Sequence, residues 1–370
     1  MKKALSFNDV LIVPGFSTIA SRKDVDLSVS FMGEKLTLPI LSAPMDTVTN
    51  ATLAIALHKA GGLATLHRFQ PIQNNIDEFK AIYIASNRKP IVSVGLNDIE
   101  RMEALYDAGA DKFLLDVAHG AQQSVVDWAN KVGSKYSNIH VMLGNFSTPE
   151  QIFKTNSLIT CNNLSWRVGV GGGSACTTRI KTGCGMPTLT SISECNNYRY
   201  PNIVGDGGFK TPGDIAKGLA AGASVVMLGG MLAGTDESPG ELIRSMQFIG
   251  DIGKFPKNWE SWTDDEAIMN VSALRQIGKQ IIKKYKSFRG SAAASSYKDQ
   301  GKEWSTAEGE EFYIPYKGSV TKVLADIEGG LRSAMTYVGA SSLTEFRERA
   351  SFIEITNNGY AESLAHGKGK

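Results

Sequence analysis

Residues 202–230, NIVGDGGFKTPGDIAKGLAAGASVVMLGG, have the pattern of one complete strand–helix–strand unit. The runs 202–205 and 224–229 are short and continuously apolar, which is typical of strands buried on both faces of a parallel sheet. Residues 212–221 between them have helical spacing and end in Ala-Gly-Ala, which is typical of a helix C-terminus. This stretch therefore predicts a parallel sheet covered by helices.

The same pattern recurs along the chain. Each apolar run ends in glycine or a polar cluster and is followed by a plausible helix, such as residues 97–108. The chain contains eight such units, which is the number that closes a TIM barrel. We therefore predict a (β/α)8 barrel, with a doubly wound open sheet as the alternative. The predicted strands are residues 39–45, 62–67, 90–95, 112–118, 140–144, 166–171, 202–205 and 224–229.

Size and composition indicate a globular protein of the cytoplasm. The 370 residues carry a net charge of +2 with no long run of one sign, which argues against partners such as nucleic acid or an anionic membrane. No apolar stretch approaches the roughly 20 residues of a membrane span. Asn8 and Asp9 interrupt the start before a secretion signal could form. Four cysteines without CxxC spacing suit neither a zinc site nor a disulfide scaffold.

Polar and glycine residues follow the predicted strands, where the active site of a barrel is assembled. Two glycine pairs come after the seventh and eighth strands, the usual phosphate position in such barrels; the alternative is ordinary loop glycines. The strand-end residues are Met45, Asp46, Thr47, His67, Arg68, Asp116, Ala118, His119, Gly144, Asn145, Asp206, Gly207, Gly208, Gly229 and Gly230.

The loop after the sixth strand, VGVGGGSACTTRIKTGCGMP (168–187), delivers Cys176 between glycines and a cluster of hydroxyls and cations. Glycines let the backbone approach a ligand, and loop amides can cradle a phosphate. A cysteine in a cationic, partly open setting is a candidate nucleophile. The alternative is an inert cysteine buried beside a tight turn.

The regular pattern ends after Leu232. Residues 233–285 include Trp259 and Trp262 and contain no predicted barrel strand. Residues 289–302 are mostly small or polar and cannot bury much surface, so we expect a mobile segment. A lid over the barrel mouth is one interpretation, and a passive surface loop is the other.

Other candidate residues are expected to be structural. Cys161, Cys184 and Cys195 have no partner spacing and are predicted to be packing residues. His58 follows Thr52 on a predicted helix and is expected at the surface or at the edge of the core.

Several ordered motifs make the chain resemble the family of inosine monophosphate (IMP) dehydrogenases and guanosine monophosphate (GMP) reductases over nearly its full length. The resemblance implies a TIM barrel that binds a purine nucleoside monophosphate, in a homotetramer. The motifs are FNDVL (7–11), APMDTV (43–48), the loop 169–187, DGGFKTPGD (206–214), MLGGMLAG (227–234), AEG (307–309), PYKG (315–318) and GGLRSAMTYVG (329–339).

The resemblance also implies roles for individual residues. Cys176 would attack C2 of the purine, and Thr178 and Glu308 would assist the leaving group. Backbone carbonyls of Gly169, Gly171 and Cys176 resemble a potassium site, although Gly172 replaces the usual proline. Substrate-binding residues would be Met45, Ser174, Asp206, Gly207, Gly208, Gly229, Gly230, Arg289, Gly290 and Ser291; cofactor-binding residues would be Asp116, Ala118, His119, Thr178, Arg179 and Ser305.

Two observations favour the reductase over the dehydrogenase. No arginine lies between Gly290 and Leu331, so the Arg-Tyr pair that activates water in the dehydrogenase is absent. Only residues 70–88 stand where most dehydrogenases insert a regulatory (CBS) module. The chain is therefore predicted to be a single catalytic domain over residues 1–370, with an insertion and flap over 233–318.

Departures from the family pattern leave alternatives open. Ser305 and Glu310 stand where cations are expected to help bind the dinucleotide, so NADH is the alternative to NADPH. Arg68 replaces a lysine, and Arg289 begins an altered base-binding loop. The lead hypothesis is NADPH-dependent reductive deamination of GMP. The alternatives are an NAD-dependent IMP dehydrogenase, a reductase of a deoxy or modified purine nucleotide, and a catalytically silent nucleotide-binding barrel.

Overall fold

The computed structural model describes residues 2–198, 200–250, 278–293, 295 and 307–364. Its main sheet is parallel and has eight strands in the order β4-β11-β10-β9-β8-β7-β6-β5. A bridge between Leu41 and Leu63 joins the two ends of this order. The prediction of a (β/α)8 barrel is confirmed. The strands are β4 (Ile40–Ser42), β5 (Thr65–Leu66), β6 (Ile91–Val94), β7 (Lys112–Asp116), β8 (His140–Phe146), β9 (Leu164–Val168), β10 (Ile203–Asp206) and β11 (Val225–Leu228).

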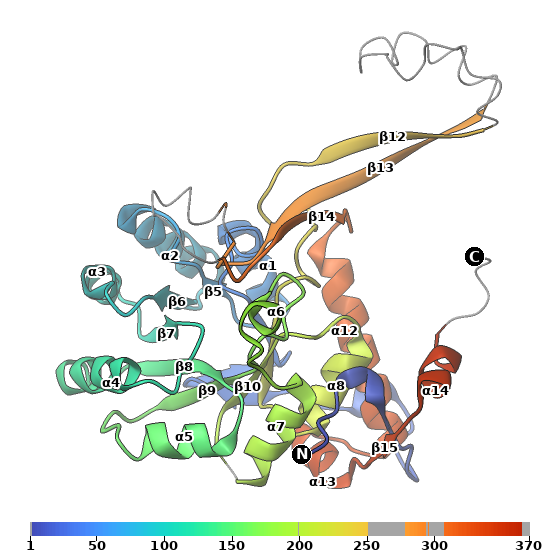
Figure 1. Cartoon of the computed structure of the whole chain (residues 1–370), viewed down its shortest axis with the longest axis horizontal. Helices are drawn as coiled ribbons and strands as arrows, with labels where there is room; N and C mark the ends of the chain where they lie inside the picture. The colour runs from blue at the N-terminus through green and yellow to red at the C-terminus, as the bar shows by residue number, and fades with distance from the viewer. Residues whose placement is uncertain (1, 199, 251–277, 294, 296–306, 365–370) are drawn as a thin grey trace.

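Helices surround the strands as an outer layer (Figure 1). In α8, Thr211 caps the first turn and forms a capping box with Asp214, while Pro212 occupies the first helical position. The barrel helices are α1 (Ala51–Lys59), α2 (Ile72–Ser86), α3 (Ile99–Asp107), α4 (Gln123–Lys135), α5 (Pro149–Asn156), α7 (Thr188–Asn197), α8 (Pro212–Ala220) and α12 (Val320–Val338); α6 (Thr178–Thr182), α13 (Leu343–Arg349) and α14 (Asn357–Glu362) are shorter.

Side chains alternate between two apolar cores along the strands. On β7, Phe113 and Leu115 pack outward against the helices, whereas Leu114 points into the barrel. The hairpin of β2 (Val29–Phe31) and β3 (Glu34–Leu36) adds Phe31 and Leu36 to the inner core. The barrel is therefore a packed layer of side chains rather than a pore.

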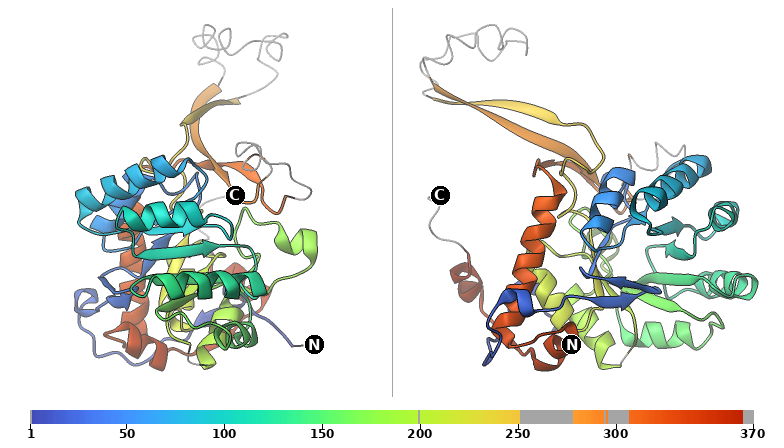
Figure 2. Two further views of the ribbon diagram at one scale, coloured as in Figure 1. Left: turned by 90° about the vertical axis from the view of Figure 1, so that its left-hand side faces the viewer. Right: turned by 180° about the vertical axis from the view of Figure 1, so that it is seen from behind.

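The insertion after β11 forms a separate antiparallel sheet of β12 (Ile243–Gly250), β13 (Gly278–Arg289) and β14 (Glu311–Pro315). The β12–β13 hairpin projects well beyond the barrel in every view (Figure 2). These strands were not predicted from the sequence. Trp259, Trp262 and most of the segment 289–302 lie outside the described residues.

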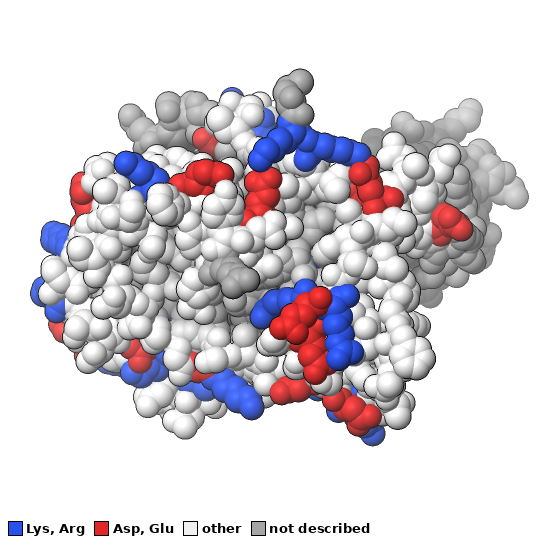
Figure 3. All heavy atoms as spheres, turned by 90° about the horizontal axis from the view of Figure 1, so that it is seen from below, with Lys and Arg blue, Asp and Glu red and all other residues white. Residues whose placement is uncertain are grey.

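The N-terminal and C-terminal segments meet at the end of the molecule away from the β12–β13 hairpin (Figure 1). Strand β1 (Val10–Ile12) pairs antiparallel with β15 (Phe352–Glu354). On the face shown in Figure 3, acidic and basic side chains of the described residues lie interspersed, in keeping with the net charge of +2. Among the helices described, none combines the length and apolarity needed to cross a bilayer.

Candidate active site

A cavity of about 670 Å³ lies where the barrel strands end. Its lining comes from the carboxyl ends of the strands β4 to β11 and the segments that follow them, together with residues 288, 290–292 and 308–309 of the insertion. This is the carboxyl end of the sheet, where barrel enzymes place their chemistry. The volume suits a ligand of nucleotide size.

The cysteine loop is held in place by one arginine. Arg179 donates from Nε and Nη2 to the carbonyl of Val170, at 3.1 and 2.9 Å, and also to the carbonyl of Met186. Gly171 has φ +70°, and a Cβ there would lie 2.5 Å from the Arg179 side chain. Arg179 thus links the start and the end of the cysteine loop through the carbonyls of Val170 and Met186.

Cys176, Thr178 and Glu308 form a chain of hydrogen bonds on the cavity wall. The Cys176 Sγ lies 3.1 Å from Thr178 Oγ1, which donates to Glu308 Oε2 at 2.7 Å. A threonine hydroxyl has a single hydrogen, so with Thr178 donating to the carboxylate the thiol must be the donor to Thr178. The three predicted catalytic residues therefore form a proton path from sulfur to carboxylate.

The segment that carries Glu308 is bonded directly to the cysteine loop. The Thr177 N–H donates to the Glu308 carbonyl at 2.8 Å, and the Glu310 N–H donates to the Ala175 carbonyl at 2.9 Å. Cys176 and Gly309 form the antiparallel bridge between these bonds. A long-range backbone contact thus fixes the carboxyl beside the thiol.

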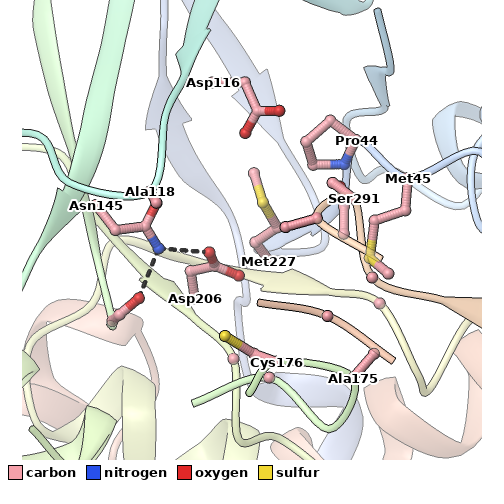
Figure 4. Close-up of a pocket in the computed structure, with 18 of the residues that line it drawn as sticks. Pro44, Met45, Asp116, Ala118, Asn145, Ala175, Cys176, Asp206, Met227 and Ser291 are labelled. Atoms are coloured by element: carbon pink, nitrogen blue, oxygen red, sulfur yellow. Dashed lines mark hydrogen bonds between the residues drawn. The ribbon is translucent and has the colours of Figure 1, made fainter. Parts of the chain in front are cut away.

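A second polar network lines the same cavity. Asn145 donates from Nδ2 to the Gly169 carbonyl at 2.6 Å and to Asp206 Oδ2 at 2.8 Å (Figure 4). Arg167 donates to Asp116 Oδ1 at 2.9 Å, and its Nε lies 3.8 Å from Asp206 Oδ2. Burial raises the pKa of Asp206, while Arg167 and Asn145 oppose that rise.

Three buried polar atoms of this region have no hydrogen-bond partner among the described residues. They are Oδ1 of Asn145, Nε of Arg167 and Nε of Arg68. All three residues line the cavity. Because an unpaired buried polar group is costly, these atoms indicate a polar ligand.

Glycines bring three loops close together where the cysteine loop meets the segments after β10 and β11. Gly207 has φ +83°, and a Cβ there would lie 2.8 Å from the Gly173 nitrogen. A Cβ on Gly230 would lie 3.3 Å from the Ser174 hydroxyl. The residues predicted to hold the phosphate all line this part of the cavity: Ser174, Gly207, Gly208, Gly229 and Gly230.

The residues predicted to contact the base divide into two groups. Met45, Gly290 and Ser291 line the cavity. Arg289 does not, because its Nη2 and Nε are bonded to the Asp46 carboxylate at 2.5 to 3.2 Å. Direct substrate contact by Arg289 thus stays a prediction, and the structure assigns it a different partner.

The residues predicted to bind the cofactor are also divided. Asp116, Ala118 and Thr178 line the cavity. His119 is exposed and Arg179 is engaged with loop carbonyls, and neither is among the lining residues described. Ser305 lies outside the described residues.

The predicted potassium ligands are backbone carbonyls of the cysteine loop. Carbonyl oxygens are suitable donors for a hard cation. Gly169 (φ +139°) and Gly171 adopt backbone angles that favour glycine. The carbonyl oxygens suit a potassium ion, but one of them, that of Gly169, already accepts a hydrogen bond from Asn145.

Burial corrects two other expectations and agrees with a third. His58 is 4% exposed; its Nε2 accepts from the Ala64 N–H at 3.0 Å and its Nδ1 lies 3.0 Å from the Ser86 hydroxyl. It is a core residue rather than a surface one. Cys195 is buried as expected, whereas Cys184 is exposed and is not a packing residue.

Sequence reasoning gave no specific role to Arg167, Asn145 or Asp46. Arg167 carried a usable signal, because a cation inside the otherwise apolar run 166–171 must find an acidic partner. Asn145 and Asp46 were visible only as strand-end polar residues.

The fold and the site together define a (β/α)8-barrel enzyme with a cavity thiol. A family model described as "IMP dehydrogenase / GMP reductase domain" matches residues 4–251 and 270–366, so the chain belongs to this family of oxidoreductases. It is 34% identical to a GMP reductase of Shewanella halifaxensis, over 98% of this chain and 97% of that protein.

Other relatives carry both names of the family. Human GMP reductase 2 is 34% identical, over 95% of this chain and 94% of its own. An inosine-5'-monophosphate dehydrogenase of Cryptosporidium parvum is 32% identical, over 98% of this chain and 95% of its own. Family membership thus leaves the direction of the reaction to be argued from the site.

Proposed function

We propose that the protein catalyses the reductive deamination of GMP to IMP and ammonia, with NADPH as reductant and NADH as the alternative. The observation that carries the proposal is the hydrogen-bonded sequence Cys176–Thr178–Glu308, with distances of 3.1 and 2.7 Å. A thiol that passes its proton to a carboxylate becomes a thiolate, which is the nucleophilic form. The same path can return a proton to a leaving amine.

In the first step the Cys176 thiolate attacks C2 of the purine, and the bond between C2 and the exocyclic nitrogen breaks. The proton held at Glu308 reaches the departing nitrogen through the Thr178 hydroxyl, so that ammonia rather than an amide ion leaves. The reduced dinucleotide, when bound, supplies the hydride that replaces sulfur at C2. Cys176 then leaves as thiolate, and the sum is GMP, NADPH and two protons giving IMP, ammonium and NADP⁺.

The remaining cavity residues bind and orient the substrate. Asp206, fixed by Asn145, would accept from the ribose hydroxyls, while loop amides near Ser174 and the glycine pairs would hold the 5′-phosphate. Met45, Gly290 and Ser291 would contact the base. Asp116, Ala118 and Thr178 would face the dinucleotide, together with His119, Arg179 and Ser305 as lesser candidates.

A second candidate is an NAD-dependent IMP dehydrogenase. It is favoured by the Cryptosporidium parvum relative, which this chain matches over 95% of its length and which carries the dehydrogenase name. Against it stands the absence of arginine between Gly290 and Leu331 in the sequence. Hydrolysis of the adduct would need another group to activate water.

The two reactions are separated by parallel assays of the purified full chain. One contains GMP with NADPH or NADH, the other IMP with NAD⁺, and both follow the near-ultraviolet absorbance of reduced nicotinamide. Loss of absorbance in the first supports the proposal. A gain of absorbance in the second assigns the dehydrogenase. No change of absorbance in either assay, with GMP still bound, assigns a non-catalytic nucleotide-binding barrel.

Assembly and ion dependence complete the proposal. We expect a cytoplasmic homotetramer, which light scattering would detect as about four times the chain mass of 39.9 kDa.

We expect K⁺ bound at the carbonyls of Gly169, Gly171 and Cys176 to order the cysteine loop. Exchange of K⁺ for a larger organic cation should then raise hydrogen exchange in residues 169–177.

A further inference from the structure

Two loops that face the base side of the cavity are joined by an ion pair. Arg289 lies at the end of β13, and Asp46 lies on the segment between β4 and α1. The Arg289 Nε is 3.2 and 3.1 Å from the two Asp46 oxygens, and Nη2 is 2.5 Å from Oδ2. The guanidinium therefore uses two nitrogens on one carboxylate.

The pair is largely buried and has a backbone partner. The two side chains are 16% and 15% exposed. The Arg289 N–H donates to Thr47 Oγ1 at 3.1 Å, and the Thr47 hydroxyl lies 3.4 Å from the Arg289 carbonyl. Removing either side chain would break a largely buried, charge-assisted contact, which is costly.

The residues next to this pair point into the cavity. Met45 precedes Asp46, and Ser291 follows Arg289 by two positions; both are on the cavity lining (Figure 4). The Gly290 N–H donates to the Glu310 carbonyl at 3.0 Å, next to the segment that carries Glu308. The ion pair thus connects both sides of the base site and the base of the insertion.

We propose that the Asp46–Arg289 ion pair is a positioning pair that sets the separation between residues 45 and 290–291 and thereby the fit of the purine ring. Arg289 acts through this geometry and does not contact the reacting atoms. The inference deepens the proposed function and rests on it, because it assumes that the base lies between these two loops.

The physical reason is the shape of the guanidinium. A planar group bonded to both carboxylate oxygens fixes distance and orientation together. A lysine would keep the charge but lose the fixed geometry. A buried pair also acts as a unit, so removing the second member after the first should cost little.

The test compares two ligands on the full chain by calorimetry: GMP, and ribose 5-phosphate, which lacks the base. In Arg289→Met and Asp46→Asn we expect GMP affinity to fall about tenfold or more, since a charge-assisted contact is lost, with ribose 5-phosphate affinity unchanged. Arg289→Lys should weaken GMP binding as well. The double variant should bind GMP no more weakly than Arg289→Met alone.

Arg349→Met, which removes the exposed i,i+4 pair with Glu345, is the matched control and should leave both affinities unchanged. Equal losses for the two ligands, additive losses in the double variant, or unchanged GMP affinity would each overturn the positioning role. If the unaltered chain binds no purine nucleotide, the proposed function itself fails. If a Met variant does not fold, Arg289→Lys carries the comparison.

Discussion

Each end of the barrel carries buried charges, and the two sets are built differently. At the N-terminal end, Lys112 lies 2.9 Å from Glu34 and 3.0 Å from Asp111, and we call these three the floor network. At the C-terminal end, Arg167 lies 2.9 Å from Asp116 but 3.8 Å from Asp206, and we call these three the cavity network. One cation is enclosed between close partners, and the other is only partly matched.

The difference separates stability from function. Arg88 adds a further close contact to the floor, with its Nε 2.9 Å from Glu34. Among the described residues, each end leaves a guanidinium nitrogen without a hydrogen bond, Arg88 Nη2 at the floor and Arg167 Nε at the cavity. The difference is that Arg167, together with Asn145, whose Oδ1 is also unpaired, lines the open cavity, whereas Arg88 does not. Substitutions at the cavity end should therefore change turnover, whereas those at the floor should change the free energy of unfolding.

The largest effect is expected at Cys176. Replacement by alanine removes the nucleophile and should lower kcat by on the order of 10⁴-fold or more, with the thermal unfolding temperature unchanged. The matched control is Cys184→Ala, which removes the exposed cysteine of the same loop and should keep full activity. An active Cys176→Ala variant would exclude the covalent mechanism.

The next effect concerns the proton path. Glu308→Gln and Thr178→Val should each lower kcat by roughly 10²–10³-fold, because each interrupts proton transfer to the leaving amine. GMP affinity, measured by calorimetry, should stay close to that of the unaltered chain. Glu311→Gln, three residues away on an exposed position, is the control, and an equal loss there would contradict the specific role of Glu308.

The floor network should respond in the opposite way. The Lys112 side chain is 5% exposed. Its replacement by methionine removes the cation that Glu34 and Asp111 share. The free energy of unfolding should fall by roughly 2–3 kcal/mol in chemical denaturation, since Glu34 keeps Arg88 and Asp111 keeps Lys89 as partners, while kcat and KM at moderate temperature stay unchanged.

Lys135→Met, which breaks an exposed pair with Glu103, should leave stability unaltered. A loss of activity without a loss of stability in Lys112→Met would erase the distinction between the two ends.

The smallest expected effect is a dependence of stability on pH that arises from His58, whose carbonyl accepts from Arg88 beside the floor network. Burial lowers the pKa of His58 to about 4 from 6.5. The unfolded chain therefore binds a proton that the folded chain excludes, so stability is full above about pH 6.5 and is lost as the pH falls toward 4.

The measurement is the difference in unfolding free energy between about pH 7 and about pH 5. In His58→Gln this difference should be about 2 kcal/mol smaller than in the unaltered chain. The exposed His119→Gln variant should keep the full difference. An unchanged pH dependence in His58→Gln would show that another group dominates.

The barrel could be predicted because its signals are local. A run such as 225–228 is apolar on both faces, and the glycines that follow it are visible without any knowledge of partners. Strands β12, β13 and β14 were missed, since they pair only with one another and their segments lack a continuous apolar run. Their pairing is decided by contacts far apart in the chain.

The site was predictable in its residues but not in its connections. Cys176 and Thr178 are neighbours in sequence, whereas Glu308 reaches them only through backbone bonds across the insertion. Arg289 was predicted to bind substrate, yet Asp46 is its partner in the fold. Such pairings depend on which loops meet above the barrel, and local sequence patterns do not show this.

The most direct test of the account is the stoichiometry of ammonium release. GMP labelled with heavy nitrogen on the exocyclic amine is incubated with NADPH and the full chain, and labelled ammonium is counted against NADPH oxidised. We predict one ammonium for each NADPH consumed, and none from Cys176→Ala. Reduction of NAD⁺ by IMP, with no ammonium formed from GMP, would contradict it.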